Sequence, residues 1–271
     1  MIRIISLAVG AFFSLALLFA FGTGAYNYVT EPPAKTAEKV YGKHPKHLDL
    51  ASNGIFGKFD EAQLQRGFAV YQNVCASCHS ISRVAYRDLG KLGYNEAEVK
   101  AIAAKATITA KDPLTGEMKD RPGLPADKFP PVVYAGKGTP PDLSLITKAR
   151  HGGAAYVYSL LTGYENQPAE VVKHFPDAKT PDGMFYNPYF ASLNLAMPPP
   201  ISSDGQVTYS DGTVATKDQM AQDVAAFLVW TAEPELEQRH QTGLWWIGFL
   251  IFATTLAYMS YRNIWAEKKG H

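Results

Sequence analysis

The sequence Cys75-Ala76-Ser77-Cys78-His79 constrains this chain more than any other feature, because it contains both cysteines of the 271 residues. Two thiols three positions apart, followed directly by a histidine, form the attachment sequence of a c-type haem. Each sulfur adds to one vinyl group at the porphyrin edge, and the imidazole of the next residue then lies beneath the iron. The prediction is one covalent haem c, bound through Cys75 and Cys78 with His79 as an axial ligand.

Two other interpretations of these cysteines are weaker. A thioredoxin-like redox pair would require a strand before the first cysteine and a βαβ pattern around it, whereas the preceding residues have helical periodicity. A structural zinc site needs four ligands, usually a second cysteine pair or two closely spaced histidines. No second pair exists, and His44 and His47 lie far upstream in a stretch broken by Pro and Gly.

The composition indicates a mostly α-helical fold with long loops. The chain contains 22 Gly and 18 Pro, many of them between residues 110 and 205. We expect a cytochrome c-like domain in which the cofactor supplies part of the core. The net charge of +1 does not indicate a nucleic-acid partner.

Both ends of the chain are apolar. Ile4–Phe21 follow a single Arg3, and small residues continue to Ala25, so residues 1–25 are predicted to be a signal peptide or a retained N-terminal anchor. Gly243–Tyr261 is uncharged and as a helix would extend roughly 30 Å, enough to cross a bilayer. Residues 241–264 are therefore predicted to form a transmembrane anchor.

The flanks of this second segment predict its orientation. Positive residues are enriched on the cytoplasmic side of membrane spans. The haem domain at 26–240 is then expected on the periplasmic side of a bacterial inner membrane, and the basic tail at 265–271 in the cytoplasm. The flanking acidic residues are Glu233, Glu235 and Glu237, and the basic ones are Arg262, Lys268 and Lys269.

Periodicity and capping residues predict four helical regions and one hairpin. One helix begins at Asp60 with Gln63 as its capping partner, and Gly67 on it would let the last helix of the domain cross closely. A small β-hairpin is expected at Val207–Val214, around Asp211-Gly212. Residues 26–59, 107–142 and 162–200 are expected to be irregular or turn-rich. The other helices are predicted at about Asn95–Ala106, at Ser144–Leu161 with a break at Gly152-Gly153, and from Thr216 onward.

The second axial ligand decides between two kinds of haem protein. A methionine sulfur is typical of an electron carrier, and an open position favours small-molecule binding or catalysis. Met197 is favoured because three prolines follow it, and their fixed φ and missing N–H groups suit a segment lying against a haem face. An ordinary loop methionine is the alternative interpretation. The other candidates are Met118 in a charged turn, Met184, Met220 on a packed helix face, His151 and His174.

Several segments together resemble the cytochrome c1 family, the haem-bearing subunits of cytochrome bc1 complexes. The resemblance covers nearly the whole chain from Gly54 onward. One departure is Ala191–Asn194, which replaces the Pro-Gly turn frequent before the methionine loop. The similar segments are Gly54–Asp60, Cys75–His79, Pro140–Ser144, Ala149–Gly153, Tyr156–Tyr164, Asn187–Phe190, Ala196–Pro200, and Asp223–Leu228 with Trp230, Ala232, Glu233 and Pro234.

The resemblance implies roles for individual residues. Met197 would be the sixth iron ligand, and Pro141 would pack near the haem. Arg150 and Tyr156 match positions that contact haem propionates, where a guanidinium can pair with a carboxylate. His151 would then be a structural histidine.

The resemblance also implies the function. The chain would be an electron-transfer subunit of ubiquinol–cytochrome c oxidoreductase, without substrate chemistry of its own. It would take one electron from a Rieske iron–sulfur subunit, pass it to a c-type cytochrome, and lie beside a cytochrome b subunit in the membrane. The alternatives are a free-standing membrane-anchored cytochrome c that serves an oxidase, and a haem enzyme with an open sixth position.

Overall fold

The computed structural model describes residues 2–112, 115–136 and 138–266. The chain forms two compact units, Met1–Gly42 with Pro168–Lys179, and Lys43–Gln167 with Thr180–His271. The basic tail predicted at 265–271 lies, after Ala266, outside the described residues.

The first unit is helical and contains one long apolar helix. Helix α1 (Ile2–Thr30) has a mean hydropathy of 2.5 over its most apolar 18 residues, and its side chains are exposed. Tyr41, at the end of α2, places its hydroxyl 2.7 Å from Nδ1 of His174, at the end of α7. The expectation of an irregular lead-in at 26–59 is therefore wrong at these helices. The short elements are α2 (Ala37–Tyr41), α7 (Ala169–His174) and the 3-10 helix η3 (Pro176–Ala178).

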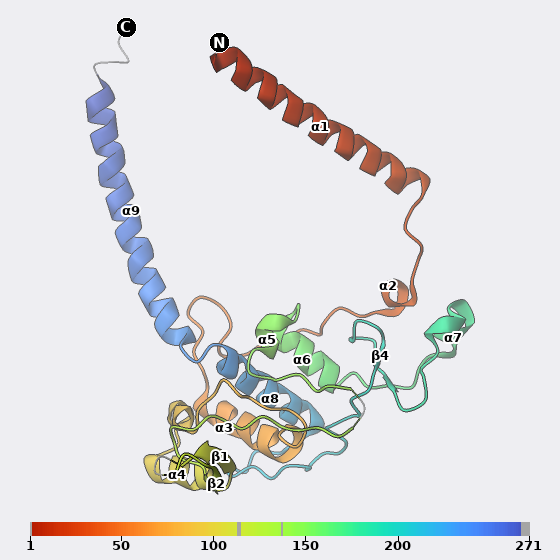
Figure 1. Ribbon diagram of the computed structural model, residues 1–271, viewed down its shortest axis with the longest axis vertical. Coiled ribbons are helices and arrows are strands. Elements are labelled where there is room, and N and C mark those ends of the chain that lie inside the picture. Colours follow the sequence, from red (N-terminus) through yellow and green to blue (C-terminus); the bar gives the residue numbers. More distant parts are fainter. Residues whose placement is uncertain (1, 113–114, 137, 267–271) are drawn as a thin grey trace. The chain divides into compact units, whose positions relative to one another are not determined.

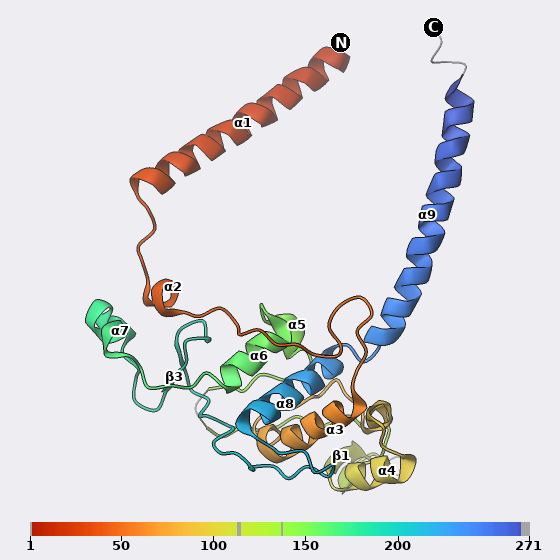
Figure 2. The same cartoon turned by 180° about the vertical axis from the view of Figure 1, so that it is seen from behind.

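Two crossing helices, α3 (Glu61–Val70) and α8 (Lys217–Ala232), form the centre of the second unit (Figures 1 and 2). The Asp60 carboxylate accepts a hydrogen bond from the backbone N–H of Gln63 and begins α3. The Thr216 hydroxyl accepts one from Gln219 and begins α8. Both helix starts are confirmed, because a side-chain acceptor at the N-cap satisfies a free N–H of the first turn.

The helix crossing depends on Gly67. A Cβ at this position would lie 2.1 Å from the carbonyl oxygen of Asp223 and 2.6 Å from the Cβ of Phe227. Only a residue without a side chain allows this approach, so the predicted close crossing is confirmed. Phe68 and Phe227 are fully buried beside it, with ring centroids 5.6 Å apart.

The remaining elements of the second unit are short, apart from one helix. The break at Gly152-Gly153 is confirmed, since Gly152 has a φ of 83° between α5 and α6. The elements are the π-helical turn η1 (Tyr71–Cys75), the 3-10 helix η2 (Tyr86–Leu92), α4 (Glu96–Ala104), β1 (Thr107–Lys111), β2 (Met118–Pro122), α5 (Ile146–Ala149), α6 (Gly153–Leu161), β3 (Phe185–Tyr186), β4 (Asn194–Leu195) and α9 (Leu236–Ala266).

The fold is mostly α with a small hairpin, as predicted. The hairpin was predicted at Val207–Val214, but it forms between β1 and β2. Strands β1 and β2 pair antiparallel, from Thr107 opposite Pro122 to Lys111 opposite Met118, in a region expected to be turn-rich. No strand forms at 207–214. There the Asp211 carboxylate accepts hydrogen bonds from the Thr213 N–H and from Arg66, which draws the segment onto α3.

Helix α9 contains the apolar segment predicted as a membrane anchor. It has 31 residues, a mean hydropathy of 1.4 over its most apolar window, and exposed side chains through that window. Together with α1 it is one of two helices in the described chain that are long and apolar enough to cross a membrane.

Candidate haem site

The cysteines follow a change in helix type. Helix α3 continues into the π-helical turn Tyr71–Cys75, in which the N–H of Ala76 donates to the carbonyl of Tyr71 at 2.8 Å. Such widened turns are rare and frequently occur at functional sites. The N–H of His79 then donates to the carbonyl of Cys75 at 2.9 Å, and the buried Tyr71 hydroxyl donates to the carbonyl of His79 at 3.0 Å. These bonds hold the attachment sequence as one compact turn.

The ring of His79 is oriented by a carbonyl from a distant segment. Its Nδ1 lies 2.8 Å from the carbonyl oxygen of Pro141. A neutral imidazole that donates Nδ1–H to a carbonyl leaves the lone pair of Nε2 available, which is the arrangement usual for metal-ligating histidines. Pro141 therefore contacts the predicted axial ligand through its backbone oxygen.

Asp142 joins the segment after Pro141 to the segment after His79. Its carboxylate accepts hydrogen bonds from the Ser80 hydroxyl (2.7 Å), the Ser82 N–H (2.8 Å) and the Ser144 N–H (2.8 Å). Burial raises the pKa of Asp142, but hydrogen bonds from Ser144, Ser82 and Ser80 outweigh burial and hold this pKa well below its ordinary value. Sequence reasoning missed this residue, although an aspartate two positions before a serine in a proline-bounded turn is a typical side-chain-to-backbone motif.

The chemistry of the thiols favours haem over the two rival interpretations. Burial, with a smaller contribution from Cys78, raises the pKa of the Cys75 thiol to about 12. Redox cysteine pairs and zinc sites use the thiolate form, and their surroundings usually lower the pKa of the thiol. The surroundings of Cys75 have the opposite effect. Among residues 2–112, 115–136 and 138–266, no three His, Cys, Asp or Glu side chains gather in a possible metal site. Two thiols and a correctly oriented imidazole fit a covalent haem.

Met197 lies on the loop after β4, half-buried, and its carbonyl accepts a hydrogen bond from the Tyr164 hydroxyl at 3.1 Å. Burial raises the pKa of Tyr164 well above its ordinary value, so this hydroxyl remains a donor. Met220 is fully buried in α8 and is confirmed as core packing, and Met118 is 67% exposed on β2. Ligation of iron by Met197 stays a prediction, consistent with a loop whose backbone is held in place.

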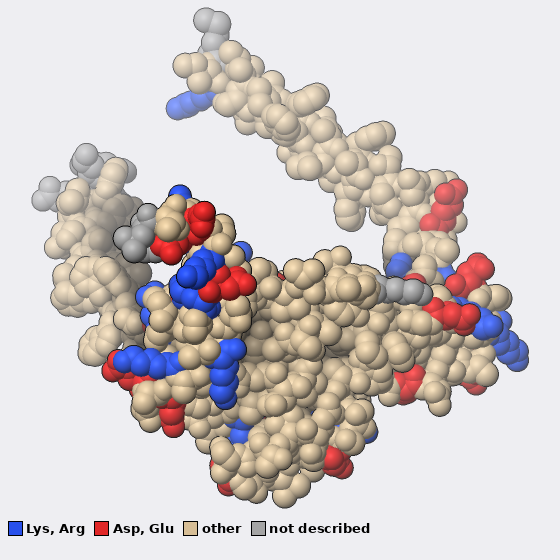
Figure 3. All heavy atoms as spheres, turned by 60° about the horizontal axis from the view of Figure 1, so that its bottom comes forward, with Lys and Arg blue, Asp and Glu red and all other residues tan. Residues whose placement is uncertain are grey.

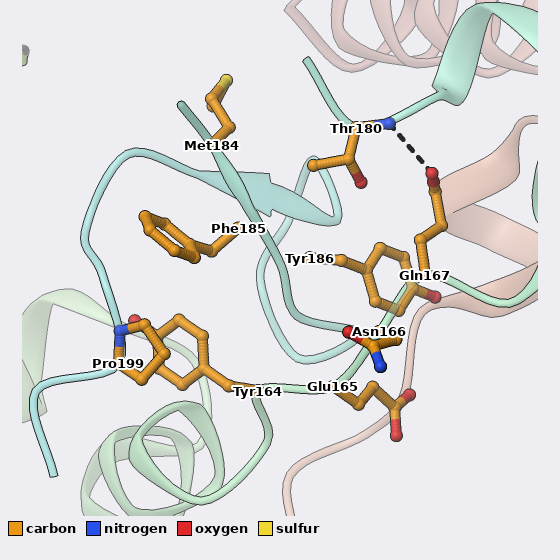
Figure 4. A pocket seen from close by; sticks show the side chains of 9 residues that line it. All are labelled: Tyr164, Glu165, Asn166, Gln167, Thr180, Met184, Phe185, Tyr186 and Pro199. Carbon is orange, nitrogen blue, oxygen red and sulfur yellow. Dashed lines mark hydrogen bonds between the residues drawn. The ribbon is translucent and has the colours of Figure 1, made fainter. Parts of the chain in front are cut away.

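A cavity of about 480 Å³ borders the Met197 loop (Figure 4). Tyr164 and Pro199 lie on one side of this cavity. On another side, the backbone N–H of Thr180 donates a hydrogen bond to the side chain of Gln167. Figure 4 shows the Met184 side chain pointing away from Tyr164 and Pro199. The lining residues are Tyr164, Glu165, Asn166, Gln167, Thr180, Met184, Phe185, Tyr186 and Pro199.

The loop before Met197 contains an unusual backbone conformation within the segment Ala191–Asn194. Leu193 has a φ of 60°, the only positive φ of a non-glycine residue in the described chain. A leucine is strained there, at a cost of order 1–3 kcal/mol. Leu193 is 1% exposed and exchanges backbone hydrogen bonds with Asn187 and Phe190. Burial and these bonds offset the strain and determine the path of the loop.

Arg150 and Tyr156 lie near each other at the corner between α5 and α6. Burial raises the pKa of Tyr156, and the neighbouring Arg150 guanidinium opposes this effect. Arg150 is exposed, and its guanidinium donates a hydrogen bond to the carbonyl of Ala149 at 3.3 Å. Their contact with haem propionates stays a prediction that this proximity supports. His151 is exposed.

A mostly helical unit with two cysteines, an oriented imidazole and one long apolar helix defines a monohaem c-type cytochrome. Residues 50–268 match the Cytochrome C1 family, and the chain belongs to this family. Its cofactor is covalently bound haem c, and Cys75, Cys78 and His79 fit the attachment motif for it.

Curated relatives agree with the family assignment. The chain is 42% identical over 238 residues to cytochrome c1 of Rhodospirillum rubrum, covering 82% of this chain and 87% of the relative. It is 46% identical over 256 residues to the mitochondrial heme protein cytochrome c1-2 of Solanum tuberosum, covering 92% and 95%. It is 40% identical over 254 residues to the mitochondrial cytochrome b-c1 complex catalytic subunit of Candida albicans, covering 89% and 84%.

Proposed function

We propose that this chain is the haem-bearing electron-transfer subunit of a cytochrome bc1 complex, a ubiquinol–cytochrome c oxidoreductase. It takes one electron from a Rieske iron–sulfur subunit and passes it to a c-type cytochrome, and quinol oxidation takes place on other subunits. The family match and the name of the Candida albicans relative support membership in such a complex. The bound haem supplies a one-electron iron couple whose potential depends on its axial ligands.

The observation that carries the proposal is the way this chain orients His79. The carbonyl of Pro141 holds Nδ1, and the Asp142 carboxylate fixes Ser80 and Ser82 relative to Pro141. A histidine ring fixed at Nδ1 by a carbonyl on a braced segment changes little in geometry between two oxidation states, which suits electron transfer. Cys75 and Cys78 keep the cofactor attached, and Met197 is assigned as the second ligand.

The location follows from the apolar helices and their flanking charges. Helix α9 crosses a bacterial inner membrane beside a cytochrome b subunit, with the haem domain on the periplasmic side and the basic tail in the cytoplasm. The exposed apolar surface of α9 supports this arrangement. Residues 1–25 form a signal peptide or a second anchor in the same orientation.

The charge distribution bears on how an acceptor docks. On the face shown in Figure 3, Lys and Arg side chains are interspersed with Asp and Glu, and the centre of the view has few charged groups. Mixed signs produce weak long-range steering.

Substitution of Met197 tests the proposal against the haem-enzyme alternative. Met197→Leu removes the sulfur and keeps the side-chain volume. We expect haem to remain covalently bound and its reduction potential to fall on the order of 0.1 V or more, within the ~0.8 V that axial ligands span. The reduced variant should bind carbon monoxide, and the reduced wild-type protein should not. Potentiometry and absorption spectra measure both effects.

Met118→Leu is the matched control, because this exposed methionine lies on β2. Its potential should equal that of the wild type. An unchanged potential in Met197→Leu, with a fall in Met184→Leu, would transfer the ligand role to Met184. Carbon monoxide binding by the wild-type protein would instead support an enzyme with an open sixth position. Copurification with a cytochrome b and an iron–sulfur subunit tests the assignment to the complex.

A further inference from the structure

A short loop at Ala51–Phe59 presents two neighbouring apolar side chains to solvent. Ile55 is 65% exposed and Phe56 is 79% exposed. Burying apolar side chains of this size is favourable, so their exposure to water is unfavourable for the free chain. We call Ile55 and Phe56 the loop tip.

The loop has a defined conformation. The Lys58 N–H donates to the carbonyl of Ala51 at 2.9 Å and closes the loop, and the Asn53 N–H donates to Leu50 at 2.9 Å. A Cβ at Gly57 would lie 2.3 Å from the carbonyl oxygen of Ser52, so the two arms of the loop are in tight contact. The exposure of the tip therefore results from the fold of the loop rather than from fraying.

The loop is attached to the beginning of α9. The N–H of Phe59 donates to Oε1 of Glu237, in the first turn of that helix, at 2.8 Å. Figures 1 and 2 both show this segment standing beside the base of α9. The uncharged part of α9 begins at Gly243, which is about 9 Å further along the helix axis at 1.5 Å per residue.

From this position we infer that the loop tip inserts into the interfacial layer of the membrane that α9 crosses. Apolar side chains such as Phe and Leu on surface-bound segments are buried about 5–10 Å into the boundary between headgroups and acyl chains. The exposed Lys58 next to the tip suits a lipid phosphate, and its aliphatic stem can lie along the apolar side chains. The loop thus forms a further membrane contact beside the base of α9 and limits how the haem domain tilts about that helix. The inference rests on the proposed membrane span of α9.

Spin labelling of the full-length haem-loaded chain in lipid nanodiscs tests this inference. Both native cysteines are consumed by the haem, so Phe56→Cys introduces the one thiol available for a nitroxide. Collision rates with oxygen, which concentrates in lipid, and with a water-soluble nickel chelate report the surroundings. Phe249→Cys on α9 is the lipid reference, and Val214→Cys, at a position 75% exposed, is the water reference.

We expect the Phe56 label to collide with oxygen several-fold more often than the Val214 label, and with nickel several-fold less often. Collision rates equal to those at Val214 would overturn the inference. Exclusion of both reagents would also overturn it, in favour of a second copy of the chain covering the tip. If the Phe249 label is itself accessible to nickel, the membrane span fails and the inference falls with it. A lipid-like Phe249 with a water-like Phe56 overturns the loop insertion alone.

Discussion

Substitution of Gly67 by alanine would separate the two central helices of the haem domain. The new Cβ would lie 2.1 Å from the Asp223 carbonyl oxygen, whereas an ordinary contact begins near 3.4 Å. The helices would have to move apart by roughly 1.3 Å, and overpacking of this kind costs about 1–3 kcal/mol. Phe68 and Phe227 would also lose close contacts in the buried core.

Helix propensity partly offsets this cost, because alanine is favoured over glycine by about 1 kcal/mol in a helix interior. Because the clash is with a backbone carbonyl, we take the upper end of the overpacking range, about 3 kcal/mol. The net loss is then about 2 kcal/mol, which corresponds to a fall in Tm of about 4–8 °C for a domain of this size. Because α3 leads directly into the attachment turn, haem absorbance and far-ultraviolet circular dichroism should report the same transition.

Gly90→Ala is the control for this experiment, because a Cβ there meets no atom within 4 Å. It should leave the Tm unchanged within about 2 °C, since surface substitutions change stability by less than about 0.5 kcal/mol. If Gly67→Ala were as stable as the wild type or more stable, helix propensity would outweigh the clash, and the reasoning about the crossing would be refuted.

Two further predictions concern buried or clamped carboxylates. Arg66→Met leaves the fully buried Asp223 carboxylate without its guanidinium partner, and the free energy of unfolding in urea should fall by about 3 kcal/mol, as it does when one partner of a buried ion pair is lost. Recovery of stability in the double variant Arg66→Met with Asp223→Leu would support this cause. An unchanged unfolding midpoint in Arg66→Met alone would contradict it. Asp142→Asn should destabilise the chain at pH 7. Because folding lowers the pKa of Asp142, its stabilisation is present above the ordinary pKa near 3.9 and is lost as pH falls below it. The difference from wild type should therefore shrink between pH 5 and pH 3, and a constant difference would show that the charge is not involved.

The attachment turn and the helix starts could be predicted from sequence because their determinants are local. Cys75, Cys78 and His79 are adjacent in the chain, and the caps at Asp60 and Thr216 act on N–H groups three residues away. The requirement for glycine at position 67 was visible as well, since a small residue on a helix's apolar face indicates a close approach.

The hairpin shows why local signals can mislead. Asp211-Gly212 has the composition of a hairpin turn, but a salt bridge from Asp211 to Arg66 holds the segment on α3 instead. At Thr107–Lys111 the β-branched residues were a usable signal that the surrounding turns obscured.

The sequence alone determined the cofactor, the family, the attachment motif and the apolar character of the two ends, because each depends on residue types at short, fixed spacing. The tertiary structure decided which groups orient the axial histidine: Pro141 and Asp142 are about 60 residues from His79 and Ser80. It also decided that Ile55 and Phe56 stay exposed beside α9, through the contact between Phe59 and Glu237. Hydrogen bonds between distant segments form only when the packed core brings them together, and no local pattern specifies such partners.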